Sequence, residues 1–264
     1  MNLQTLTVSL VQSNLFWENK MANLEMFADK IKMLKGKTEV VILPEMFNTG
    51  FSMEAGKLAE TMDGETVSWM KRMAVENKIV LTGSIIIKES HQYFNRLIWM
   101  LPNGNFGTYD KRHLFSYAGE DQFYTPGNKR FIASVKGWKI NCLVCYDLRF
   151  PVWSRQSSLV ENNYDVLLYV ANWPAKRSDT WKALLQARAI ENQCFVLGVN
   201  RLGKDGNGHL YEGESSILDP MGNIIYQRKD EETTLTYTLS KEMLIKTRDH
   251  FPFLKDADDF TIIN

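Results

Sequence analysis

The sequence predicts an α/β protein in which helices cover mixed β-sheets, and two patterns support this fold class. Segments with apolar residues at alternate positions are interspersed with segments in which apolar residues recur at helical spacing. Pairs of strand-like segments joined by tight-turn residues interrupt that alternation, so the sheets are not all parallel. No linker, repeat or low-complexity segment divides the chain, and we therefore expect a single domain over residues 1–264.

The N-terminal segments already contain both element types. Gln4–Gln12 alternates apolar and polar residues, as a half-buried strand does. Apolar residues then repeat at helical spacing from Met21 to Leu34, and Gly36 follows as a helix stop signal. Glu39–Leu43 is a short apolar run, which is typical of a buried strand.

Two hairpins are predicted in the middle of the chain. The first joins Tyr93–Leu101 to Phe106–Tyr109 through an Asn-Gly turn. The second joins Phe131–Val135 to Trp138–Val144 through a Lys-Gly pair. A polar, aromatic-rich loop, Lys111–Lys129, connects the two hairpins.

The remaining elements follow from the same periodicities. Helices are predicted at Gly64–Asn77, at Pro151–Val160 with the proline in its first turn, at about Asp179–Asn192, and from Ser240 as a short helix before a polar tail. Strands are predicted at Ile79–Ile87, Asp165–Val170, Phe195–Asn200, Ser215–Leu218, Ile224–Gln227 and Leu235–Thr238, with a glycine-rich turn at Gly203–Gly208.

Composition and charge argue against several classes of protein. The formal net charge is zero and no basic run is present, so we expect no nucleic-acid partner. The N-terminus lacks the features of a signal peptide, and the apolar runs are shorter than the roughly 20 residues that span a bilayer. Three cysteines are a sparse and odd set, which favours a reduced, cytoplasmic protein without a membrane partner.

Two of the cysteines, Cys142 and Cys145, are three positions apart in the segment INCLVCYDLRFP. Strand alternation places Cys142 on one face and Cys145 on the other, so neither a disulfide nor a shared metal is expected. Cys142 is predicted to be a core residue. Cys145 is located where the strand gives way to a turn, and it is either another buried thiol or an exposed nucleophile.

Two charged residues have a similar position relative to their strands. Glu45 and Lys111 each follow an apolar strand and open a loop. With Cys145 they suggest one sheet edge that carries a carboxylate, an amine and a thiol, although both charges could equally be solvated loop residues.

Five segments in order resemble the nitrilase superfamily, the carbon–nitrogen hydrolases. Three of them are the signature segments LPEMF (Leu43–Phe47), YDKRHLF (Tyr109–Phe115) and CYDLRFP (Cys145–Pro151). The other two are ANWPAKR (Ala171–Arg177) and ARAIENQCFVLGVNR (Ala187–Arg201), so the resemblance covers nearly the whole chain.

This resemblance implies a four-layer α-β-β-α sandwich, a homodimer, and a reaction without metal or cofactor. It implies that Glu45 is the base, Cys145 the nucleophile and Lys111 the oxyanion donor, helped by the backbone N–H of Tyr146. It also implies that Glu120, in the loop after the lysine, orients the lysine or the substrate.

Within the superfamily, CYDLRFP and YDKRHLF look most like the omega-amidases, which hydrolyse the side-chain amide of 2-oxo acids such as 2-oxoglutaramate and 2-oxosuccinamate. Arg149 would grip the far carboxylate of such a small-molecule substrate, unless it pairs with Asp147. Candidate pocket aromatics, each with core packing as the alternative, are Phe47, Phe115, Tyr117 and Trp173.

Two other functions stay open. One is a different carbon–nitrogen hydrolase activity, on deaminated glutathione, a nitrile or an N-carbamoyl substrate. The other is a non-catalytic relative that binds a partner, which the intact Glu45, Lys111 and Cys145 make less attractive.

Overall fold

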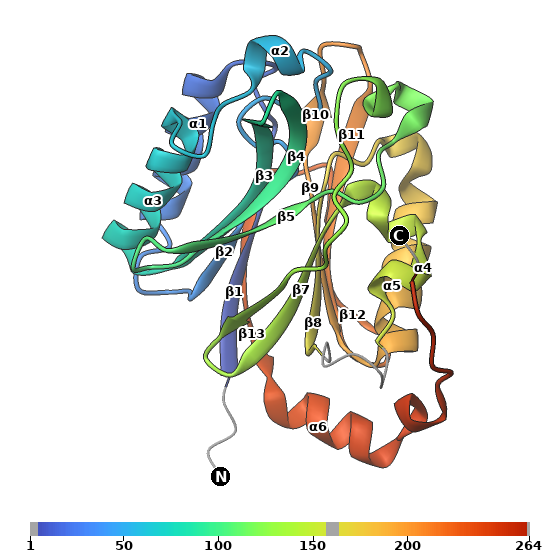
Figure 1. Ribbon diagram of the computed structural model, residues 1–264. Helices are drawn as coiled ribbons and strands as arrows, with labels where there is room; N and C mark the ends of the chain where they lie inside the picture. The colour runs from blue at the N-terminus through green and yellow to red at the C-terminus, as the bar shows by residue number, and fades with distance from the viewer. Residues whose placement is uncertain (1–4, 157–163, 263–264) are drawn as a thin grey trace.

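The computed structural model describes residues 5–156 and 164–262. Two mixed β-sheets pack face to face, and helices cover the outer face of each (Figure 1). The predicted α/β class and the four-layer α-β-β-α sandwich are thereby confirmed.

The first sheet has the strand order β13-β1-β2-β3-β4-β5. Strands β1, β2 and β3 are parallel to one another, while β13, β4 and β5 each join by an antiparallel pairing. Its strands are β1 (Thr5–Gln12), β2 (Val40–Ile42), β3 (Val80–Glu89), β4 (Gln92–Met100), β5 (Phe106–Asp110) and β13 (Thr233–Ser240).

The second sheet has the order β10-β11-β9-β8-β7-β6, with β12 paired to β11. Its centre, β7 to β9, is parallel, and the outer strands are antiparallel. Its strands are β6 (Ile132–Val135), β7 (Trp138–Val144), β8 (Val166–Ala171), β9 (Phe195–Asn200), β10 (Leu202–Lys204), β11 (Leu210–Leu218) and β12 (Ile224–Lys229).

Helices α1 and α3 lie against the first sheet, and α4 and α5 lie on the side of the second (Figure 1). The helices are α1 (Lys20–Lys32), α2 (Ala55–Leu58), α3 (Glu65–Asn77), α4 (Pro151–Ser154), α5 (Ser178–Asn192) and α6 (Lys241–His250). None of the helices in the described part of the chain combines the length and apolar character needed to cross a membrane.

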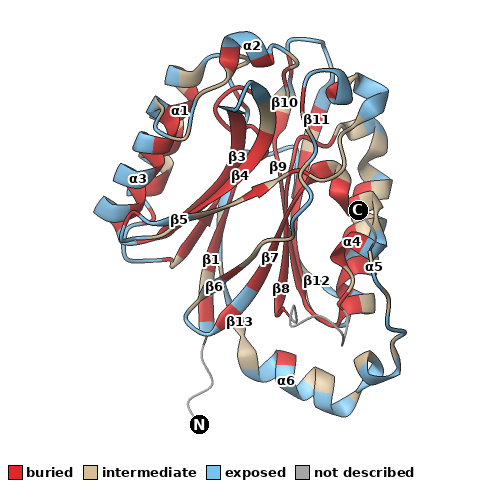
Figure 2. Cartoon of the chain, viewed as in Figure 1, coloured by how far each residue is buried: buried red, intermediate tan, exposed pale blue. Residues whose placement is uncertain are grey.

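The largest apolar core fills the space between the two sheets, where the strands are buried (Figure 2). Strand alternation builds it: Leu6, Val8 and Leu10 of β1 belong to this core, whereas Val11 belongs to the layer under α1 and α3. The predicted core position of Cys142 is confirmed, since its side chain is completely buried between the sheets.

Most predicted elements are confirmed, but three differ from expectation. The helix predicted at Pro151–Val160 ends at Ser154, because Arg155 has the extended ψ of 134°; residues 157–160 lie outside the described residues. The short helix α2 was not predicted. Part of the glycine-rich turn at Gly203–Gly208 is strand β10, which pairs with β11.

Candidate active site

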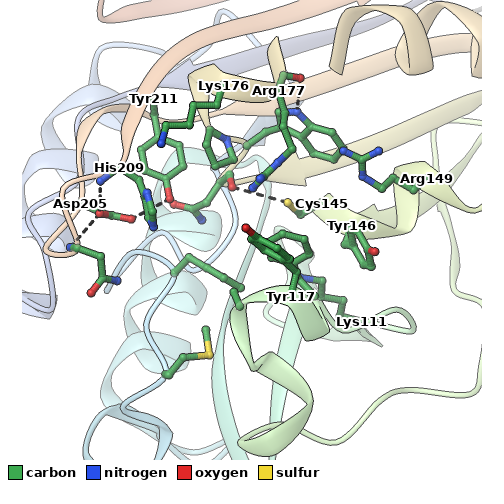
Figure 3. Close-up of a pocket in the computed structure, with 18 residues that line it drawn as sticks. Lys111, Tyr117, Cys145, Tyr146, Arg149, Lys176, Arg177, Asp205, His209 and Tyr211 are labelled. Atoms are coloured by element: carbon green, nitrogen blue, oxygen red, sulfur yellow. Dashed lines mark hydrogen bonds between the residues drawn. The ribbon is translucent and has the colours of Figure 1, made fainter. Parts of the chain in front are cut away.

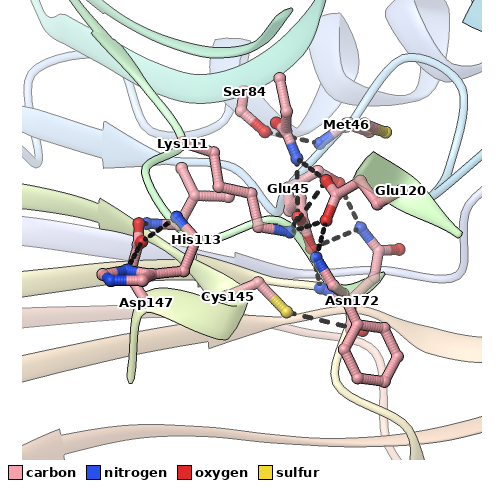
Figure 4. A network of polar contacts seen from close by, with 12 residues as sticks. Glu45, Met46, Ser84, Lys111, His113, Glu120, Cys145, Asp147 and Asn172 are labelled. Atoms are coloured by element: carbon pink, nitrogen blue, oxygen red, sulfur yellow. Dashed lines mark hydrogen bonds and ion pairs between the residues drawn. The ribbon is translucent and has the colours of Figure 1, made fainter. Parts of the chain in front are cut away.

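Glu45, Lys111 and Cys145 each follow the carboxyl end of a strand, as predicted, but the strands do not form one sheet edge. Glu45 comes after β2 and Lys111 directly after β5, both in the first sheet, whereas Cys145 follows β7 in the second. The expectation of one shared sheet edge is wrong. The side chains meet because the two sheets pack against each other and their strand ends face a common space (Figure 4).

The Lys111 ammonium lies between two carboxylates. Its Nζ is 3.0 Å from Oε1 of Glu45, and 3.0 and 2.8 Å from the two carboxylate oxygens of Glu120. All three side chains are at most 1% exposed. Since buried charges of this kind are stable only when paired and hydrogen-bonded, the three groups depend on one another.

At Lys111, the effect of the neighbouring carboxylates on the pKa outweighs the effect of burial. Burial alone would lower the pKa of this lysine, but the carboxylates of Glu120 and Glu45 raise it above the ordinary value, and the ammonium stays charged. Burial raises the pKa of Glu120, and Glu45 adds to this, while Lys111 opposes it. A backbone N–H from Phe115, 2.6 Å from Oε2, also holds the Glu120 carboxylate.

Cys145 begins a tight 3₁₀ turn, Cys145–Arg149, immediately after β7. Its backbone has a φ of +43°, a left-handed conformation that costs a non-glycine residue roughly 1–3 kcal/mol. Such a bend directs the side chain away from the strand, toward the space where Glu45 and Lys111 lie (Figure 4).

The environment of Cys145 favours a neutral thiol. Burial raises its pKa well above the ordinary value, and the neighbouring Glu45 raises it further, while Lys111 acts in the opposite direction. The thiol is within hydrogen-bonding reach of the Glu45 carboxylate, and its sulfur lies 3.8 Å from the carbonyl oxygen of Asn172. A thiol in this state needs a base at the moment of attack, and Glu45 is placed to be that base.

Two asparagines that the sequence analysis missed hold the carboxylates. Asn95 donates from Nδ2 to Glu45 at 2.8 Å and to Glu120 at 3.3 Å. Asn172 donates its backbone N–H to Oε2 of Glu45 at 2.8 Å and its side-chain Nδ2 to the Glu45 carbonyl at 2.6 Å. Asn172 directly follows β8, so the same signal of a polar residue after a buried strand could have identified it.

Asp147 anchors the turn that carries Cys145. Its Oδ2 accepts the N–H of Val144 at 3.0 Å and the hydroxyl of Tyr109 at 2.7 Å. Its Oδ1 accepts the backbone N–H of His113 at 3.0 Å and contacts His113 Nδ1 at 2.8 Å. Tyr109 and His113 flank Lys111, so Asp147 ties the lysine segment to the cysteine segment.

A pocket of about 480 Å³ opens above Cys145 (Figure 3). Of the predicted aromatics, Phe115, Tyr117 and Trp173 line it, together with Tyr146. Phe47 does not. It is fully buried and packs between Phe27 and Trp69 under the helices, so the core alternative holds for this residue.

Arg149 also lines the pocket, and the alternative of an ion pair with Asp147 is wrong. Asp147 is occupied by the donors named above, whereas the Arg149 guanidinium lies over the rings of Trp173 at 5.0 Å and Tyr146 at 6.0 Å. Stacking on aromatic faces fixes the planar guanidinium, and its N–H groups form no hydrogen bond with the part of the chain that the structure describes, so they can bind a ligand.

The arrangement contains the parts of an acyl-transfer site. It has a thiol, a carboxylate beside it, an ammonium, and a pocket with a cationic wall. Among residues 5–156 and 164–262, no three His, Cys, Asp or Glu side chains are grouped as metal ligands.

Known proteins match nearly the whole chain. Residues 7–249 match the family model described as carbon–nitrogen hydrolase. The omega-amidase YafV of Escherichia coli (strain K12) is 44% identical, over 97% of this chain and 98% of its own. The 2-oxoglutaramate amidase of Bacillus subtilis (strain 168) is 29% identical, over 95% of this chain and 96% of its own.

A solved structure is also very similar. It is XC1258 from Xanthomonas campestris, described as a CN-hydrolase superfamily protein with an arsenic adduct in the active site. It superposes with a TM-score of 0.97 at 42% identity, covering 98% of this chain and all of its own. Fold, motifs and relatives agree, and the chain belongs to the carbon–nitrogen hydrolase family.

Proposed function

We propose that the protein is an omega-amidase, which hydrolyses the terminal amide of small 2-oxo dicarboxylate monoamides such as 2-oxoglutaramate and 2-oxosuccinamate. The observation that carries the proposal is the buried Lys111, held between Glu45 and Glu120 beside the Cys145 thiol at the base of a pocket. The names of the relatives, omega-amidase and 2-oxoglutaramate amidase, support this substrate class.

In the proposed reaction, Glu45 takes the proton of the Cys145 thiol as the sulfur attacks the amide carbon. Proton removal and attack are coupled, because the raised pKa of the thiol disfavours a free thiolate. Glu45 then passes the proton to the amide nitrogen. The carbon–nitrogen bond breaks, ammonia leaves, and a thioester on Cys145 remains.

Lys111 and the backbone N–H of Tyr146 stabilise the tetrahedral oxyanion in this scheme. A lysine has three N–H groups, and those of Lys111 all have carboxylate oxygens within 3.0 Å. The substrate oxygen must therefore compete with one of these carboxylate oxygens for an N–H group of the ammonium, while Glu120 keeps the ammonium in place.

Water completes the proposed cycle. Glu45, deprotonated again once ammonia has left, takes a proton from a water molecule that attacks the thioester. The carbon–sulfur bond breaks, Glu45 returns the proton to the Cys145 sulfur, and the acid product leaves. Arg149, stacked on Trp173, is the proposed partner of the substrate carboxylate.

A substrate panel tests the proposal. The purified protein should release ammonia from 2-oxoglutaramate and 2-oxosuccinamate with a higher kcat/KM than from deaminated glutathione, nitriles or N-carbamoyl amino acids. Cys145→Ala should abolish this activity, whereas Cys194→Ala, which removes a buried thiol outside the site, should retain it. If the protein turned over every 2-oxo acid amide poorly and another of these substrate classes well, it would belong to a different branch of the carbon–nitrogen hydrolases.

We also propose a homodimer and a cytoplasmic location. Val152 and Phe253, which line one surface depression, and Ile190 are more than half exposed, and a second subunit would cover such apolar side chains. Cys142, Cys145 and Cys194 are all free thiols, which fits the reducing cytoplasm. Sedimentation of the purified protein as a monomer would contradict the dimer.

A further inference from the structure

The catalytic pocket is strongly biased toward positive charge. Arg149, Lys176 and Arg177 line it, and none of them forms an ion pair with another described residue. Figure 3 shows the three on one side of the pocket, across from Tyr117. Lys111 is a fourth lining cation, but it is paired with two carboxylates, Glu45 and Glu120, and therefore adds no net positive charge to the pocket.

Aromatic residues of the pocket wall also hold Arg177 in place. Its guanidinium lies over the Phe115 ring at 5.0 Å, and its backbone carbonyl accepts the indole N–H of Trp173 at 2.8 Å. Trp173 also lies under Arg149. Trp173 thus holds the Arg149 guanidinium and the Arg177 backbone, and Phe115 holds the Arg177 guanidinium, so both side chains are ordered before a ligand binds and lose less entropy on binding.

The single carboxylate among the described lining side chains, Asp205, is already occupied. Its Oδ1 accepts the backbone N–H groups of Asn207 and His209, both at 2.9 Å, and its Oδ2 accepts the Tyr211 hydroxyl at 2.9 Å. A ligand ammonium that entered the pocket would meet one carboxylate, whose oxygens already accept three hydrogen bonds, and three cationic side chains without a carboxylate partner among the described residues.

We propose that Arg177 acts with Arg149 as the specificity-determining pair of this enzyme: together they bind the carboxylate beside the 2-oxo group and reject the α-ammonium of glutamine and asparagine. The inference rests on the proposed function and deepens it. Glutamine and 2-oxoglutaramate have the same reacting amide and the same carboxylate, so discrimination must come from the group between them, which is neutral in one and cationic in the other. In a partly water-excluded pocket, repulsion between like charges is stronger than in bulk water.

The proposed binding of the substrate carboxylate is tested by measuring the kinetics of Arg177→Gln on two amides. For 2-oxoglutaramate, kcat/KM should fall about 10- to 100-fold, mainly through KM, as for a lost charge-assisted hydrogen bond. Pentanamide has the same chain length and no carboxylate. For this amide, the factor by which kcat/KM falls in Arg177→Gln should be about tenfold smaller. Arg177→Lys should recover part of the loss, because it keeps the charge without the planar fork.

Arg72→Gln is the matched control. It removes an exposed arginine of α3 that is not among the residues lining the pocket, and it should leave both substrates unaffected. Equal losses on both amides in Arg177→Gln would mean that Arg177 only supports the pocket wall, and no loss on either would mean that it does not contact the substrate. Both results overturn the proposal.

The proposed rejection of the α-ammonium is tested by comparing the kcat/KM of Arg177→Glu for glutamine with that for 2-oxoglutaramate. The wild-type preference for 2-oxoglutaramate over glutamine should shrink at least about tenfold in this variant, because a new carboxylate faces the ammonium. An unchanged preference overturns the proposed rejection.

A binding measurement separates this inference from the proposed function. Calorimetric titration with 2-oxoglutarate, the reaction product, measures the affinity of the carboxylate subsite without any turnover. If the wild-type protein hydrolyses no 2-oxo acid amide, the proposed function fails. If Arg177→Gln binds 2-oxoglutarate as tightly as the wild type, the carboxylate subsite fails, whatever the turnover.

Discussion

At the scale of the residue, Cys145 is the proposed nucleophile, and its surroundings oppose ionisation of its thiol. Burial is the largest reason that its pKa is raised, and the negative charge of Glu45 is the next, while Lys111 alone lowers it among the charged neighbours. The thiol therefore stays protonated until the substrate arrives. In the proposed mechanism, attack therefore requires Glu45 to take the proton.

The first prediction concerns Glu45→Gln. The variant should lose essentially all turnover, because the base is gone, and yet the pKa of the Cys145 thiol should fall. The substitution removes a group that raises this pKa and leaves Lys111, which lowers it. The thiolate absorbance in the ultraviolet, measured against pH and corrected with Cys145→Ala, reports the shift.

Glu25→Gln, on the exposed face of α1, is the control and should change neither quantity. The interpretation fails if the titration of Cys145 moves to higher pH in Glu45→Gln, or if that variant keeps wild-type turnover.

At the scale of the element, the decisive feature is the turn after β7. Cys145 adopts a left-handed backbone there, and Asp147 compensates by accepting hydrogen bonds from Val144, Tyr109 and His113. His113 in turn stacks on Phe150 at 3.8 Å, at the end of the same turn. The nucleophile is thus positioned by the lysine segment, although the two segments belong to different sheets.

Asp147→Asn tests this anchoring. One acceptor oxygen is replaced by an NH₂ group that faces existing donors, so the free energy of unfolding should fall by about 2–4 kcal/mol. Urea denaturation measures this, and kcat should fall as well, because the thiol loses its fixed position. Asp249→Asn, on the exposed face of α6, should stay within about 0.5 kcal/mol of the wild type. Wild-type stability and kcat in Asp147→Asn would show that the turn needs no such anchor.

At the scale of the whole molecule, the site exists because two sheets face each other. Periodicity in the sequence predicted nearly every strand and helix, since alternate burial is a local property of the chain. It could not assign β5 and β7 to different sheets, because sheet membership depends on pairings between distant segments. For that reason Glu45, Lys111 and Cys145 were expected at one edge, whereas they meet across the sandwich.

The supporting residues were missed for related reasons. Asn95 is one of several polar residues in β4, and only the fold reveals that its amide reaches both Glu45 and Glu120. Arg177 was included in a family-like segment, but its place in the pocket depends on Phe115, which lies under its guanidinium, and on Trp173, which binds its backbone carbonyl. The sequence motifs identified the reactive groups, whereas the residues that hold those groups in place become visible only from the tertiary packing.

The central claim is that Cys145 carries the acyl group of the substrate during turnover. The most direct measurement is rapid quenching in acid during turnover of 2-oxoglutaramate, followed by mass spectrometry of the intact and digested protein. We predict an adduct with the mass of the substrate less ammonia, located on the peptide that contains Cys145 and absent from Cys145→Ala. An adduct on another residue, or full turnover by Cys145→Ala without any adduct, would contradict the account.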